Sequence, residues 1–249
     1  MINGKKIIVC LPAYNASETL ALTYHDIPMD IVDEIILVDD ASKDDTLQVA
    51  EALGIRHILK HTTNKGYGGN QKTGYEKALE LGGEIIIMVH PDYQYNPKLI
   101  PSMAYLVANG IFPVVLGSRI LGKGALKNGM PLYKYIANRF LTFVQNILLN
   151  QKLSEYHTGY RAFAADVLQS INLAANSDDF VFDNQVLAQI FFMGHEVGEI
   201  SCPARYFTGC SSINFKRSVV YGYGVLVTSV LYRLNKWRLL KSKIFQTPI

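Results

Sequence analysis

The 249-residue chain is predicted to fold as an α/β sandwich around a mostly parallel central sheet. In its first half, short aliphatic runs alternate with segments of helical period, and these runs are apolar throughout instead of alternating with polar residues. Such runs suit parallel strands that helices cover on both faces. With 49% apolar residues, a chain of this length has enough material for a large core and is not intrinsically disordered.

The expected elements follow in order along the chain. We expect strands over Lys6–Leu11, Glu34–Val38, Ile55–Leu59, Glu84–Val89 and Phe112–Leu116, separated by helices over Ser17–His25, Lys43–Leu53, Gly69–Leu81 and Pro97–Asn109. The second half is less regular, with a helix expected over Pro131–Asn150 and a polar run over Glu155–Arg161. We therefore expect one domain over residues 1–215 and a C-terminal helical extension over residues 216–249.

Charge is unevenly distributed. The chain carries +3, but residues 216–249 hold seven Lys and Arg and no acid, which leaves −4 for residues 1–215. A mildly acidic body lacks the basic footprint of a nucleic-acid-binding protein, so no nucleic-acid partner is expected. Cys10, Cys202 and Cys210 form no CxxC pair, and the N-terminal apolar run is shorter than a signal-peptide core, which together indicate a reducing, cytoplasmic compartment.

The basic tail contains an apolar stretch and the single tryptophan, Trp237. Its uncharged run, Ser218–Tyr232, has 15 residues, fewer than the roughly 20 that a spanning helix needs. Such a helix either lies among lipid headgroups, attracted by anionic lipid, or packs on the domain or on a second copy. The sequence leaves both alternatives open, and the oligomeric state with them.

Polar residues follow three expected strands: Pro12–Asn15, Asp39–Ser42 and His90–Gln94. The carboxyl ends of parallel strands meet at one sheet edge, which is where ligands bind in open α/β folds. Asp39 and Asp40 precede the expected helix by too much to cap it and can accept hydrogen bonds from a base or ribose, whereas Asp44 and Asp45 look like capping residues.

Asp92 and Gln94 stand two residues apart after the buried run IIIMV, so in extended backbone both side chains point the same way. A carboxylate and an amide oxygen are ligands that suit Mg²⁺ or Mn²⁺ shared with a diphosphate. The alternative is a plain turn, because Pro91-Asp92 and Asn96-Pro97 are turn formers and His90 then only ends a strand.

Three further motifs each have a structural and a functional interpretation. Arg119 follows the fifth strand, where a guanidinium can neutralise diphosphate oxygens. Asp183 either caps a helix or has a catalytic role. NKGYGGNQKTG differs from the phosphate loop GxxxxGK[ST] at Gln71, whose side chain obstructs close approach to phosphate, so a P-loop phosphotransferase is disfavoured and a glycine-rich loop before a helix near Gly69 is expected.

Taken together, these motifs resemble the family-2 glycosyltransferases with the GT-A fold, and within them the dolichyl- or polyprenyl-phosphate sugar synthases. LPAYNASETL resembles their P-x-Y-N-E, VDDASKDDT their DDGSxDGT, NKGYGGNQKTGYEKAL their N-x-G-x-x-x-A-x-x-x-G, and LGSRILG their GSR segment. The resemblance covers about Ile7–Ser212 and implies a GT-A-type α/β/α sandwich.

The resemblance also implies roles for individual residues. Pro12, Tyr14 and Asp39, with Asp40 beside it, would line the nucleoside site, Asp92 and Gln94 would hold Mg²⁺ or Mn²⁺, and Arg119 would touch phosphate. EYHTGYRAF resembles D-x-T-S-G-F-R, with Glu155 and Arg161 in place of its acid and arginine.

Several positions depart from the family pattern. His90 stands where the first metal-binding Asp is usual, and its imidazole can still bind Mn²⁺, while Ala16 replaces an acid. CPARYFTGCSSINF matches the V-P-x-x-F…R-x-x-G-x-S-K segment only loosely, with Gly209 and Ile213 near its expected cations. Arg205, Lys216 or Arg217 are then the candidate substitutes.

The implied activity is inverting transfer of a sugar from a nucleotide-diphosphate sugar to an acceptor, first of all a polyprenyl phosphate. A lipid phosphate is already ionised and needs no general base, whereas a hydroxyl of a glycan or glycolipid needs one, for which Asp183 is the candidate. A non-catalytic nucleotide-binding module is the remaining alternative. Peripheral attachment to the cytoplasmic face of a membrane through residues 216–249 would accompany a lipid acceptor.

Overall fold

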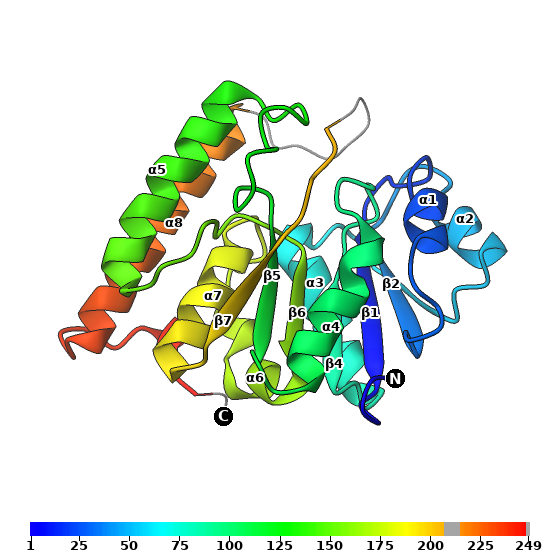
Figure 1. Cartoon of the computed structure of the whole chain (residues 1–249), viewed down its shortest axis with the longest axis horizontal. Coiled ribbons are helices and arrows are strands. Elements are labelled where there is room, and N and C mark those ends of the chain that lie inside the picture. The colour runs from blue at the N-terminus through cyan, green and yellow to red at the C-terminus, as the bar shows by residue number, and fades with distance from the viewer. Residues whose placement is uncertain (207–214, 248–249) are drawn as a thin grey trace.

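The computed structural model describes residues 1–206 and 215–247. In that part of the chain, seven strands form one sheet in the order β3-β2-β1-β4-β6-β5-β7, with helices on both faces (Figure 1). The strands are β1 Ile7–Ala13, β2 Glu34–Asp39, β3 His57–Lys60, β4 Ile85–Met88, β5 Val114–Ser118, β6 Arg161–Ala164 and β7 Val197–Ser201. The helices are α1 Leu20–His25, α2 Thr46–Ala52, α3 Gly66–Glu80, α4 Ile100–Ala108, α5 Leu132–Leu149, α6 Ala165–Ser170, α7 Phe182–Met193 and α8 Phe215–Lys236, with 3₁₀ turns at Pro97–Leu99, Leu173–Ala175 and Lys243–Phe245.

The sheet is parallel except at β6, which runs antiparallel to both β4 and β5. Successive side chains of β1 enter opposite cores: Ile8 and Cys10 pack with α3 and α7, while Ile7, Val9 and Leu11 pack with α1, α2 and α4. Burial on both faces explains why the strands are apolar throughout. The predicted α/β sandwich is thereby confirmed.

The glycine-rich stretch was wrongly predicted as a loop, because helix α3 begins at Gly66 and includes it. A Cβ at Gly68 would come 2.4 Å from the carbonyl oxygen of Ser177, and one at Gly66 would come 2.6 Å from that of Asp178. Gly68 N donates to Asp178 O at 2.7 Å. These glycines therefore let the start of α3 pack against the segment before α7, and they form no phosphate loop.

Strands β6 and β7 were not predicted from the sequence. Strand β6, Arg161–Ala164, begins at the last residue of the polar run Glu155–Arg161 and has only four residues, so no apolar run marks it. Helices α1 and α2 begin three residues later than expected. In both cases Asp44 is the cause, since its carboxylate accepts hydrogen bonds from Ser17 N at 3.0 Å and Thr46 N at 3.1 Å and ties the two preceding loops together.

The expected C-terminal helix corresponds to α8, which runs beside α5 at one edge of the molecule (Figure 1). Arg233 Nη2 donates to Ile147 O at 2.8 Å, joining α8 to α5, and Lys236 Nζ donates to Phe192 O of α7 at 3.0 Å. Over residues 1–206 and 215–247, no helix combines the length and apolarity that crossing a bilayer requires. Cys10 and Cys202 are buried free thiols, while Cys210 lies outside the described residues.

Candidate active site

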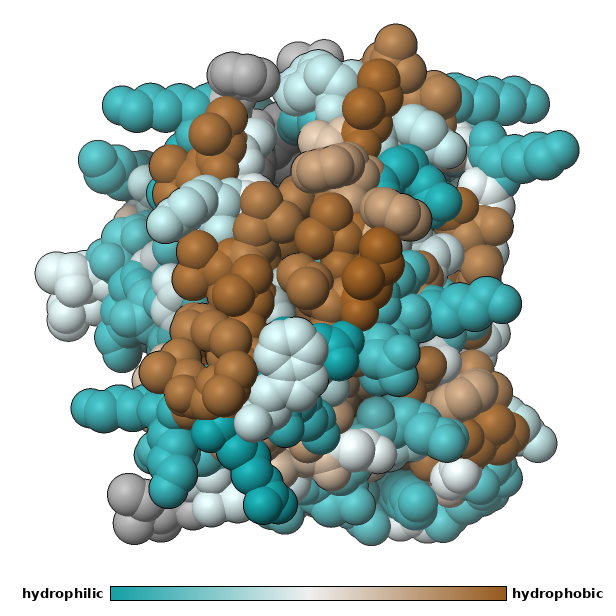
Figure 2. Space-filling model, turned by 90° about the vertical axis from the view of Figure 1, so that its left-hand side faces the viewer, coloured by the Kyte–Doolittle hydropathy of each residue, from teal (hydrophilic) through white to brown (hydrophobic). Residues whose placement is uncertain are grey.

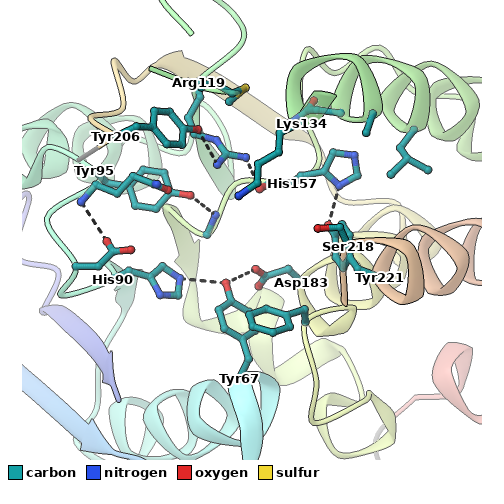
Figure 3. Close-up of a pocket in the computed structure, with 18 of the residues that line it drawn as sticks. Tyr67, His90, Tyr95, Arg119, Lys134, His157, Asp183, Tyr206, Ser218 and Tyr221 are labelled. Atoms are coloured by element: carbon teal, nitrogen blue, oxygen red, sulfur yellow. Dashed lines mark hydrogen bonds between the residues drawn. The ribbon is translucent and has the colours of Figure 1, made fainter. Parts of the chain in front are cut away.

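A cavity of about 240 Å³ opens at the carboxyl ends of β4 and β5, between the sheet and the pair of helices α5 and α8 (Figure 3). Segments far apart in the sequence contribute to its wall: α3, the segments after β4 and β5, α5, the segment before β6, α7 and α8. Its lining includes Tyr67, His90, Asp92, Gln94, Tyr95, Arg119, Tyr133, Lys134, Ala137, Asn138, Leu141, His157, Asp183, Tyr206, Ser218 and Tyr221. The structure thus brings together five of the predicted site residues: His90, Asp92, Gln94, Arg119 and Asp183.

His90, Tyr67 and Asp183 form a hydrogen-bonded chain across the floor of this cavity (Figure 3). The Tyr67 hydroxyl donates to Asp183 Oδ2 at 2.6 Å and lies 3.1 Å from His90 Nε2, and the two rings stack at 5.3 Å. Burial lowers the pKa of His90 despite the nearby Asp92 and Asp183 charges, so the imidazole is neutral. Because the single Tyr67 proton goes to Asp183, His90 Nε2 carries the proton that completes the chain, and Nδ1 keeps its lone pair.

Both carboxylate oxygens of Asp183 accept hydrogen bonds from other residues of the protein. Besides Tyr67 at Oδ2, Gln71 Nε2 donates to Oδ1 at 3.3 Å and the Arg161 guanidinium lies 3.7 Å from Oδ1. Arg161 is fully buried and donates to the carbonyl oxygens of Tyr156, Thr158 and Asp183 itself. It therefore holds the wall of the cavity in place, and the arrangement of Asp183 argues against a free general base.

Arg119 reaches the cavity as an ion pair with Glu155. Its Nε donates to Glu155 Oε1 at 2.9 Å, its Nη2 bonds to the same oxygen, and its backbone N donates to Oε2 at 2.7 Å. Burial acts to raise the pKa of Glu155, but the charge and hydrogen bonds of Arg119 outweigh it and lower that pKa. The guanidinium is thus rigidly placed and largely neutralised, with Nη1 directed to the Tyr206 hydroxyl at 3.3 Å.

Asp92 and Gln94 both line the cavity, yet the backbone between them is not extended as predicted. Tyr93 has a φ of 55°, and Asp92 Oδ1 accepts from Gln94 N at 3.1 Å, so the segment is a turn. Within the described residues, no group of three or more His, Cys, Asp or Glu is arranged to hold a metal ion. The donors at the cavity, Asp92 with the lone pair of His90 and the Gln94 amide, fit a cation only when a bound ligand supplies further oxygens.

The predicted nucleoside residues lie at the same sheet edge, on the β1–β2 side and outside the cavity lining. Asp39 is fully buried, and its Oδ1 has no hydrogen-bond partner, whereas Oδ2 accepts from Ser42 N at 3.2 Å. A buried carboxylate oxygen without a donor is costly unless a ligand satisfies it. Pro12 is half-buried and Tyr14 is exposed at the end of β1.

Asp40, which the sequence places beside Asp39 at the nucleoside site, makes its contacts within the protein. Its carboxylate accepts from His61 Nδ1 at 2.7 Å, Lys65 N at 2.8 Å and Gly66 N at 3.0 Å, so both oxygens are satisfied by the protein and anchor the start of α3. Its neighbour Asp39 alone retains an unpaired oxygen.

Arg205, the candidate substitute for a cation of the family, packs against the turn that follows β4. It is exposed outside the cavity, its guanidinium stacks on the Tyr93 ring at 5.3 Å, and its backbone N donates to Gln94 O at 2.9 Å. The other candidate cations, Lys216 and Arg217, begin α8, where Arg217 lies over the Phe180 ring at 5.1 Å. Gly209 and Ile213 lie outside the described residues.

Several cavity residues were not found from the sequence. His157 pairs through Nδ1 with the Tyr221 hydroxyl at 2.7 Å, its Nε2 is buried without a partner, and burial lowers its pKa to about 4. Tyr67 sits in the glycine-rich motif, but nothing there distinguished it from a core aromatic. Lys134 and Tyr221 come from helices whose pattern shows only apolar periodicity, so no motif marked them.

Comparison with known proteins agrees with this geometry. The family model described as "Glycosyl transferase family 2" matches residues 8–171. The chain belongs to this family. This family-2 glycosyltransferase is 31% identical, over 68% of its length and 73% of the relative's, to a UDP-N-acetylglucosamine–dolichyl-phosphate N-acetylglucosaminyltransferase of Methanococcus voltae. It is 28% identical to an undecaprenyl-phosphate mannosyltransferase of Micrococcus luteus, over 78% of this chain and 82% of the other.

Among solved structures, the glucosyl-3-phosphoglycerate synthase of Mycobacterium tuberculosis, crystallised with Mn²⁺, UDP and phosphoglyceric acid, superimposes with a TM-score of 0.69. The match covers 92% of this chain and 79% of that one at 17% sequence identity. At this identity the likeness establishes a shared fold.

Proposed function

We propose that the protein is an inverting glycosyltransferase that moves a sugar from a nucleotide-diphosphate sugar to a polyprenyl phosphate. The observation that carries the proposal is the cavity at the carboxyl ends of β4 and β5, where His90 and Asp92 face α5 and α8 across a space that cationic and polar side chains line. Relatives named for dolichyl-phosphate and undecaprenyl-phosphate transfer support the choice of acceptor.

The donor would lie across the sheet edge. Its nucleoside would sit beside Pro12 and Tyr14, where the unpartnered Oδ1 of Asp39 accepts a hydrogen bond from the base or ribose. Asp92, His90 and Gln94 would hold Mg²⁺ or Mn²⁺ together with the diphosphate. When bound, such a cation offsets negative charge on the departing nucleoside diphosphate.

The surroundings of Asp183 favour a phosphate acceptor over a hydroxyl. Its two oxygens accept hydrogen bonds from Tyr67 and Gln71, so Asp183, the candidate base, is engaged with the protein and poorly placed to remove a proton from a hydroxyl. A phosphate monoester is already anionic near neutral pH and attacks without a base. Lys134 places positive charge in the wall where that phosphate would bind, and Arg119, although its charge is largely offset by Glu155, can still donate hydrogen bonds there.

A lipid acceptor has to be collected from a membrane, which fits peripheral attachment through residues 216–249. That segment is basic and free of acids, and anionic lipid attracts such a segment by about 1 kcal/mol per cation.

The test is a transfer assay with a panel of nucleotide sugars, polyprenyl phosphate in detergent, and Mn²⁺ or Mg²⁺. We expect sugar transfer with at least one donor, loss of transfer in Asp92→Asn, and no change in the control Asp30→Asn, whose side chain is exposed away from the cavity. Nucleotide binding without turnover of any donor would instead identify a non-catalytic module, and unchanged turnover in Asp92→Asn would remove the cation assignment.

A further inference from the structure

Helices α5 and α8 each present an uncovered apolar stripe to solvent. On α5 the stripe consists of Leu132, Ile136, Phe140, Phe143 and Ile147, each 58–64% exposed. Their spacing of four, four, three and four residues places them on one face of the helix. On α8 the stripe consists of Val220, Tyr223, Val227 and Val230, 38–70% exposed, again at spacings of three and four.

The two stripes form one surface, which we call the α5–α8 face. The helices lie side by side in Figure 1, and Figure 2 shows their apolar side chains merging into a continuous patch bordered by hydrophilic ones. Contacts between the helices agree: Arg233 Nη2 donates to Ile147 O, and a Cβ placed on Gly222 would come 3.7 Å from Leu141 Cδ1. At 1.5 Å per residue the helices are about 27 and 33 Å long, so the face is far larger than scattered exposed side chains produce.

The charges around the α5–α8 face indicate what kind of surface binds to it. No acidic residue occurs in 132–149 or 215–247, whereas these segments contain nine Lys and Arg: Lys134, Arg139, Lys216, Arg217, Arg233, Lys236, Arg238, Lys241 and Lys243. A second copy docked through the same face would bring two positive rims together without compensating acids. An anionic lipid surface complements both features, since it takes up apolar side chains and attracts the surrounding cations.

The residues that follow α8 extend the same pattern. Trp237, Leu239 and Leu240 are 62%, 71% and 41% exposed and alternate with Arg238 and Lys241. Tryptophan beside basic residues is typical of segments that sit at headgroup level.

We infer that the α5–α8 face, and not the C-terminal segment alone, docks the protein onto an anionic bilayer surface. The inference rests on the proposed function for its purpose: the inner sides of the same helices line the cavity through Lys134, Asn138, Ser218 and Tyr221. Tyr133 and Ala137 are exposed and also line the cavity, so the cavity is continuous with the docking face. A polyprenyl phosphate headgroup can therefore enter the cavity while its chain stays in the bilayer.

The experiment is flotation of the full chain with vesicles of equal parts phosphatidylglycerol and phosphatidylcholine, and with phosphatidylcholine alone. We expect binding to the anionic vesicles that weakens with salt, and a drop of at least tenfold in the partition coefficient of Phe143→Glu combined with Ile136→Glu. The control is Tyr105→Glu, which changes a 56%-exposed side chain on α4, a helix that packs on the opposite face of the sheet, and this variant should bind like the wild type. Circular dichroism melting identifies any variant that is unfolded.

Two outcomes would overturn the inference: wild-type protein that ignores anionic vesicles, or a Phe143→Glu, Ile136→Glu variant that is folded and binds as well as wild type. If the wild type does not bind vesicles and sediments as a dimer, and this variant sediments as a monomer, the face would be assigned to contact with a second copy. Assaying transfer to a short, water-soluble isoprenyl phosphate separates this surface from the proposed function. The variant should keep that activity, and wild-type protein that binds vesicles but transfers nothing would refute the function while leaving the surface intact.

Discussion

Replacing Tyr67 with phenylalanine removes the hydroxyl that joins His90 to Asp183 and leaves the ring in place. Two hydrogen bonds disappear, that to Asp183 Oδ2 at 2.6 Å and that from His90 Nε2 at 3.1 Å. Asp183 loses one donor and the His90 N–H loses its acceptor, which costs about 2 kcal/mol of folding stability.

The larger expected effect is on cation binding. Without an acceptor at Nε2, the neutral imidazole is free to adopt either tautomer, and its Nδ1 lone pair is no longer fixed. Loss of a hydrogen bond that orients a ligating histidine typically reduces metal affinity by about 10- to 100-fold. We therefore expect Mn²⁺ to bind Tyr67→Phe, in the presence of the nucleoside diphosphate of its donor, at least about tenfold more weakly.

Two measurements check this reasoning. Electron paramagnetic resonance of free Mn²⁺ gives the dissociation constant, and ¹⁵N NMR of the metal-free protein shows which His90 nitrogen carries the proton. The matched control is Tyr95→Phe, which removes another hydroxyl of the same cavity, one that accepts from Gly159 N at 3.1 Å. An unchanged Mn²⁺ affinity in Tyr67→Phe, or wild-type protein protonated at Nδ1, would refute the role given to the Tyr67–Asp183 chain.

Three further substitutions test the rest of the site. Glu155→Gln leaves the buried Arg119 charge unpaired and should lower the free energy of unfolding by about 3–5 kcal/mol in urea denaturation. The control Glu80→Gln removes an exposed partner of Lys77 and should cost less than about 1 kcal/mol. Similar losses in both variants would contradict the buried ion pair. Asp39→Asn should weaken binding of the nucleoside diphosphate of its donor about tenfold in calorimetry without lowering the melting temperature, because Oδ1 has no partner in the chain. Full affinity would place the nucleoside elsewhere. Burial lowers the pKa of His157 to about 4 from 6.5, so the unfolded chain binds more protons between these pH values and stability falls as the pH drops through them. The loss amounts to about 3 kcal/mol, and the free energy of unfolding of His157→Gln should lack that part of the pH dependence; parallel pH profiles would show that His157 is not buried as a neutral ring.

The sequence predicted the elements that burial determines and missed those that depend on tertiary contacts. The apolar runs of β1, β2 and β4 identified the sheet because both of their faces are covered. Strand β6 is four residues long, and only its pairing with β4 and β5 makes it a strand. Similarly, the start of α3 at Gly66 depends on the carbonyl groups of Ser177 and Asp178, more than a hundred residues away.

The site residues likewise divide into those that the sequence revealed and those that depend on tertiary contacts. Motifs located His90, Asp92 and Asp183 because polar residues at strand and helix ends are conspicuous in an apolar chain. They did not show that Asp40 faces inward to hold His61 and α3, since adjacent aspartates look alike until the backbone orients them. Nor did they show the α5–α8 face, because an apolar helical stripe has the same pattern whether it packs on a core or meets a membrane.

The most direct test of the account is to offer the protein polyprenyl phosphate and the corresponding polyprenol, side by side, with a nucleotide sugar donor that it turns over, and to identify the lipid product by mass spectrometry. We predict a glycosyl phosphodiester from the phosphate and no product from the alcohol, because the Asp183 carboxylate, the candidate base, is held by Tyr67 and Gln71. A glycoside formed from polyprenol, or donor hydrolysis with both lipids unmodified, would contradict it.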